Sequence, residues 1–130
     1  MTTLPDLHDG FFDGLWLSAD NARFFVRTVA GERSTIILTD VEALNICGLR
    51  AGNIILDLVL IAPDKLTAKD IEQAYDLKSG EVEQASQLLC RAQEQGLYGL
   101  QINPSYGAEG TAIFRAVATV PEHVLAYSPR

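Results

Sequence analysis

The sequence predicts an α+β fold in which two helices come before the last two strands of a mostly antiparallel sheet. Up to residue 62, short apolar segments alternate with turn-forming residues, as expected of strands joined by short loops. Between residues 67 and 95, apolar residues recur at the three- and four-residue spacing of helices. Beyond residue 96 the strand pattern returns, and this order of elements is typical of α+β domains.

The sheet is expected to have five to seven strands. They cover residues 10–18, 22–29, 33–39, 54–62, 97–102 and 111–120, with a short strand or an irregular segment over 41–48 and a loop over 103–110. Within 22–29, Phe24 and Val26 alternate with Arg23 and Arg27, as they would on the two faces of a strand. Several segments are apolar on both faces. This favours a sheet curled into a half-barrel, or a dimer that covers the second face, over a flat sheet.

Each predicted helix begins at a capping signal. Thr67 is expected to cap the first helix because Asp70 follows three residues later, as in a capping box. Ser79 is expected to cap the second, whose apolar positions extend from Val82 to Ala92, and Gly96 is expected to end it.

The composition indicates one globular domain over residues 1–130, with residues 121–130 as a peripheral tail. At 48% hydrophobic residues the chain has enough apolar material for a core, so intrinsic disorder is not expected. Ten Lys+Arg against 17 Asp+Glu give a formal net charge of −7. An acidic chain is a poor partner for nucleic acid and for anionic membrane surfaces.

A cytoplasmic location is expected. The first ten residues lack the basic and apolar regions of a secretory signal, and the apolar run 54–62 is too short to span a bilayer. In that compartment Cys47 and Cys90 are expected to be buried free thiols, with Cys90 on the core side of its helix.

Motifs for common chemistries are missing from the sequence. It has no phosphate-binding or dinucleotide-binding glycine loop and no serine nucleophile elbow. Two histidines are too few for a three-histidine zinc site, and the acids do not follow calcium-loop spacing. We expect no metal and no cofactor. The pattern disfavours enzymatic activity but leaves that question open.

Asp57 is the strongest candidate for a site because it interrupts an apolar strand. Asn53 lies four residues earlier and is expected on the same face. A buried carboxylate needs a partner, so Asp57 is expected to pair with an arginine, to line a cavity, or to lie exposed at an edge. Its candidate arginines are Arg23, Arg27 and Arg115.

The remaining candidates lie near turns. His8 and Asp9 form either an acid–base pair or a turn that enters the first strand, and adjacent residues of an extended chain would point to opposite faces. Tyr106 lies in the loop 103–110, as a binding residue or as part of the turn. Residues 1–22 hold four aspartates and no Lys or Arg, which predicts either an acidic face for a basic partner or an ordinary solvated surface. The binding candidates are His8, Asp9, Asn53, Asp57, Tyr106 and Arg115.

The first 60 residues carry a resemblance. Leu7-His8-Asp9-Gly10, then the segment 39–44, then Gly52-Asn53-Ile54-Ile55 resemble small bacterial α+β families related to the immunity proteins of polymorphic toxin systems. The chain departs from their pattern because no Trp or Phe stands just before His8 and because the helical region 67–95 is additional. The resemblance implies neutralisation of another protein by binding.

The expected function is therefore a non-catalytic protein–protein interaction domain of the immunity-like kind. The alternative is a small-molecule-binding protein or an enzyme, with a pocket between sheet and helices lined by Asn53, Asp57 and an arginine. A third possibility is self-association into a homodimer.

Overall fold

The computed structural model describes residues 4–78 and 80–121. Its elements, in chain order, are β1 (Phe11–Ser18), β2 (Asn21–Arg27), β3 (Arg33–Cys47), β4 (Asn53–Ile61), the 3-10 turn η1 (Pro63–Lys65), α1 (Ala68–Tyr75), α2 (Val82–Glu94), β5 (Tyr98–Tyr106) and β6 (Glu109–Pro121). The α+β class and the two helices before the last two strands are as predicted. The predicted tail, apart from Pro121, lies outside the described residues.

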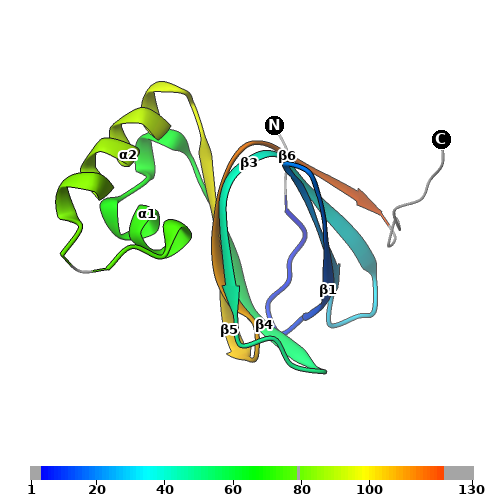
Figure 1. Cartoon of the computed structure of the whole chain (residues 1–130). Helices are drawn as coiled ribbons and strands as arrows, with labels where there is room; N and C mark the ends of the chain where they lie inside the picture. The colour runs from blue at the N-terminus through cyan, green and yellow to red at the C-terminus, as the bar shows by residue number, and fades with distance from the viewer. Residues whose placement is uncertain (1–3, 79, 122–130) are drawn as a thin grey trace.

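The six antiparallel strands close into a barrel with the order β1-β2-β3-β6-β5-β4 (Figure 1). The sequence left the sheet either open or curled into a half-barrel, and the structure corrects both alternatives to a closed barrel. Closure between β1 and β4 depends on two residue pairs, Phe11 with Ile54 and Phe12 with Asn53. The helices lie together outside the barrel, on one side (Figure 1).

Bends and bulges explain where the predicted strand limits are wrong. The two segments 33–39 and 41–48 form one long strand, β3, because Asp40 takes a left-handed conformation (φ 54°) and a bulge follows between Val41 and Ala43. The predicted loop 103–110 is mostly strand. Only Gly107, at φ 95°, and Ala108 separate β5 from β6.

Two apolar clusters hold the fold together. The barrel interior is filled by residues of all six strands, and within it the rings of Phe12 and Phe24 meet edge to face, 5.6 Å apart. Ile71 of α1 and Ala85 of α2 bury against Ile113 on the outer face of β6, in the second cluster. The amphipathic pattern therefore predicts the burial of Ile71, Ala85 and Ala92 correctly, but Val82, which the pattern places on the same face of α2, is 63% exposed.

The helix ends confirm one capping prediction. Thr67 and Asp70 form the reciprocal capping box of α1, and Gly96, at φ 70°, follows the last turn of α2. Ser79, the predicted cap of α2, lies outside the described residues. Among the described residues, neither helix has the length and apolar character that crossing a membrane requires.

Both cysteines are exposed, so the prediction of buried thiols is wrong. On α2 the buried residues are Ala85 and Ala92. Cys90 is two residues from Ala92, about 200° around the helix, and therefore points away from the barrel. Cys47 is the last residue of β3, opposite Glu109 at the start of β6.

Candidate functional site

A cleft of about 620 Å³ lies between α1 and the barrel wall made by β3, β5 and β6. Its lining is mostly hydrogen-bonding side chains: Asn45, Cys47, Lys69, Glu72, Gln73, Asp76, Leu77, Gln101, Ile102, Asn103, Glu109, Gly110 and Thr111. The cleft lies between sheet and helices, where the sequence placed the alternative pocket, but its lining contains neither Asn53, Asp57 nor an arginine.

Polar contacts fix α1 against the barrel and so define the cleft. The Asn45 Nδ2 donates to the main-chain oxygen of Gln73 at 2.8 Å, and the Thr111 hydroxyl donates to the Gln73 side chain at 3.3 Å. Farther along, the Gln101 Nε2 donates to Oδ1 of Asp70 at 2.7 Å. These bonds reach α1 from three different strands. The helix is thus held in place, and the cleft needs no rearrangement of α1 to form.

The cleft is electronegative. Three carboxylates line it, Glu72 and Asp76 from the α1 side and Glu109 from β6, against the single ammonium group of Lys69. Among residues 4–78 and 80–121, none of the three carboxylates is in an ion pair. The C-terminal end of α1 also points its partial negative charge toward this region, and no basic residue stands in its last turn. A cation is the ligand that this field attracts.

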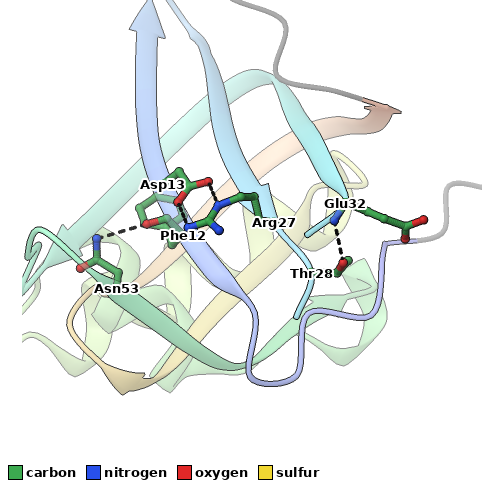
Figure 2. A network of polar contacts seen from close by, with 6 residues as sticks. All are labelled: Phe12, Asp13, Arg27, Thr28, Glu32 and Asn53. Carbon is green, nitrogen blue, oxygen red and sulfur yellow. Dashed lines mark hydrogen bonds and ion pairs between the residues drawn. The ribbon is translucent and has the colours of Figure 1, made fainter. Parts of the chain in front are cut away.

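Asn53 has a structural role outside the cleft. It is 6% exposed, and its Oδ1 accepts the backbone N–H groups of Arg50 (2.7 Å) and Ala108 (3.0 Å). Its Nδ2 donates to the carbonyls of Phe12 (3.2 Å, Figure 2) and Arg50 (2.8 Å). All four hydrogen-bonding positions of the amide are therefore occupied by the protein itself.

Asp57 lies on the opposite face from Asn53, because the pairing of β4 with β5 shifts between Ile55 and Asp57. That bulge leaves Leu56 and Asp57 exposed and reverses the alternation on which the same-face prediction depended. Asp57 accepts a hydrogen bond from Asn103 at 2.7 Å.

The expected arginines have other contacts. Arg27 pairs with Asp13 (Figure 2), Arg23 lies 5.3 Å from the Trp16 ring, and Arg115 lies 3.7 Å from Asp40. Among the arginines that the structure describes, none forms an ion pair with Asp57. Arg115, a binding candidate, is exposed and also donates to the carbonyl of Gln95 at 3.3 Å.

His8 and Asp9 form a turn before β1. The left-handed Asp9 (φ 62°) brings its carboxylate to 3.6 Å from Nε2 of His8, so the expectation that the two point apart is wrong. The Nδ1 of His8 lies 2.9 Å from the carbonyl oxygen of Leu56. Tyr106 is exposed and is the last residue of β5, so it lies in a strand rather than in the predicted loop. None of these three lines the cleft.

The N-terminal aspartates are spread along β1 and both of its ends. Asp9 precedes β1 and Asp20 follows it, so the eight-residue strand separates them by roughly 25 Å. Between them, the charge of Asp13 is balanced by Arg27. The cleft acids were missed because only the i, i+4 spacing of Glu72 and Asp76 is visible in the sequence. Their meeting with Glu109 depends on the barrel topology.

Other site chemistries are not found in the described part of the chain. No group of three His, Cys, Asp or Glu side chains there is arranged to hold a metal ion, and no histidine lines the cleft. Comparison of the chain with protein-family models, with curated proteins and with solved structures gives no match.

Proposed function

We propose that the protein is a non-catalytic protein-binding domain that takes a basic segment of a partner protein into the α1 cleft. The observation that carries this proposal is the convergence of Glu72, Asp76 and Glu109 from two walls of one cleft without an ion-pair partner among the described residues. Each would form a charge-assisted hydrogen bond with a lysine or arginine of the partner.

The character of the cleft supports a protein partner. Ligand pockets for small organic molecules are mostly apolar, whereas here Leu77 and Ile102 are the apolar side chains of the lining apart from the thiol of Cys47. The net charge of −7 would also steer a basic protein toward this chain. The resemblance of the first 60 residues to immunity proteins is consistent with this proposal, with a toxin protein as the partner.

A cationic small molecule is the second candidate. The volume of about 620 Å³ is within the range of small-molecule sites, and the amides of Asn45, Gln101 and Asn103 would add oriented acceptors. A polyamine would fit this chemistry without a protein partner.

Fluorescence anisotropy with a labelled hexa-arginine peptide tests the proposal. The triple variant Glu72→Gln/Asp76→Asn/Glu109→Gln is expected to weaken binding at least tenfold, because the loss of even one charge-assisted hydrogen bond, worth about 1.5–3 kcal/mol, corresponds to a factor of ten or more. The control Glu32→Gln/Glu42→Gln/Asp64→Asn removes the same charge away from the lining.

Equal weakening by both triple variants would overturn the cleft proposal, because binding would then follow net charge alone. If spermidine displaces the peptide with a Kd as low as that of the peptide itself, the result would instead favour the small-molecule candidate.

A further inference from the structure

The C-terminal half of β4 has a strand partner on one side only. Its residues Asp57 to Ile61 pair with Asn103 to Gly99 of β5. On the β1 side, pairing stops at Asn53 and Ile54. The chain before β1 adds two backbone bonds, both to Ile55, and the His8 ring then reaches the carbonyl of Leu56. Within the described residues, Asp57–Ile61 therefore form a free strand edge.

The barrel is also less well sealed along this edge. Leu15 of β1 and Leu58 and Leu60 of β4 pack on the core but are only half-buried, whereas Leu100 and Ile102 of β5 are fully buried. In Figure 1, β1 and β4 meet at the lower end of the barrel and separate above it, and the chain before β1 runs through the space between them, with Leu4 and Leu7 packed on the core. On this side, the backbone groups of Asp57–Ile61 have no strand partner among the described residues and are available to pair with another strand.

The sequence of the edge, Asp57-Leu58-Val59-Leu60-Ile61, complements itself. An antiparallel pair of two such edges about a two-fold axis at Val59 places Leu58 opposite Leu60 of the second copy. Asp57 then faces Ile61 of the second copy, so no two carboxylates meet. Val59, 38% exposed on the outer face, faces Val59 of the second copy, and opposed β-branched residues stabilise paired strands. The edge has no lysine or proline, the residues that commonly prevent such pairing.

We propose that two copies of this chain form a homodimer by antiparallel pairing of their β4 edges over residues 57–61. The contact is isologous, as most homodimer contacts are. The charge of −7 on each chain opposes association, so added salt strengthens the dimer. The edge contains none of the cleft acids Glu72, Asp76 and Glu109, although β5, which pairs with it, also lines the cleft. The inference does not depend on the proposed function.

Sedimentation velocity and hydrogen exchange test the dimer together. Wild-type protein is expected to shift from monomer to dimer over roughly a hundredfold rise in concentration, as mass action requires. The backbone amide protons of residues 57–61 are expected to become more protected from hydrogen exchange over the same range of protein concentration.

Val59→Lys is expected to abolish both changes, because it would place two ammonium groups opposite each other. Val29→Lys, at a residue 71% exposed in the β2–β3 turn, is the matched control and is expected to dimerise like wild type. Melting curves check that both variants are folded.

Three results would overturn the proposal: a monomer at all concentrations, a dimer without new protection at residues 57–61, or a dimer that persists in Val59→Lys. The triple cleft variant separates this proposal from the proposed function. It is expected to dimerise like wild type and to lose peptide binding. Loss of dimerisation would therefore count against the β4 dimer alone, and loss of peptide binding bears on the proposed function alone.

Discussion

Arg27 on β2 holds Asp13 on β1 in a two-point ion pair, with Nε 2.6 Å from Oδ2 and Nη2 3.0 Å from Oδ1 (Figure 2). Asp13 lies in the bulge between Phe12 and Gly14, which turns its carboxylate outward to meet the guanidinium. The hydrogen bond to Asp13 raises the pKa of Arg27, and the guanidinium also lies 4.4 Å from the centre of the Phe11 ring.

Asp13→Asn is expected to destabilise the protein by about 0.5–1 kcal/mol, the range of a partly exposed pair with good geometry. Urea denaturation measures the loss, and Asp20→Asn, in the turn after β1, is the control. Because the pKa of Arg27 is higher in the folded state than in the unfolded state, its charge contributes fully to the free energy of unfolding below the unfolded-state pKa. This contribution is lost only as the pH rises through the higher folded-state pKa. Arg27 itself therefore adds no pH dependence in the neutral range. Equal stability of Asp13→Asn and wild type would show that the pair contributes nothing.

Asn53→Ala is expected to cost about 2–4 kcal/mol, because it removes four hydrogen bonds and leaves buried backbone groups of Phe12 and Ala108 without their partner. Asn103→Ala, which removes one exposed bond to Asp57, is expected to cost far less in the same urea titration. A small effect of Asn53→Ala would indicate that water replaces the amide, and would count against the structural role assigned to it.

Gly107→Ala and Gly31→Ala form a matched pair, because both glycines have a φ near 95°. A Cβ at Gly31 meets nothing within 4 Å, whereas a Cβ at Gly107 would come within 2.4 Å of the Asn53 Oδ1. Gly31→Ala is expected to cost about 1 kcal/mol through its left-handed backbone alone. A clearly larger loss of thermal stability is expected for Gly107→Ala. Similar losses would contradict the close packing of the β5–β6 turn against Asn53.

The parts of the fold set by local chemistry could be predicted from the sequence. The capping box of Thr67 and Asp70 needs only four residues, and the burial of Ile71 and Ala85 follows from helical spacing. Phe24 and Val26 alternate with Arg23 and Arg27, which predicts correctly that the two apolar residues face the core.

The parts set by strand pairing could not be predicted. The bulge in β4 moved Asp57 to the face opposite Asn53, and the left-handed Asp40 joined two expected strands into one. The cleft needed Glu109 of β6 to be brought beside α1, which is a consequence of strand order rather than of any local pattern. Candidate sites chosen from single residues therefore missed it.

The most direct test of the central claim, that the α1 cleft binds a basic segment, is an amide NMR titration with the hexa-arginine peptide. Saturable shifts are expected at residues 72–77, around the end of α1, and at residues 109–111 of β6, and these shifts are expected to be absent in the triple cleft variant. Shifts confined to the β1–β2 hairpin, or no shifts at peptide concentrations that saturate the anisotropy signal, would contradict this claim.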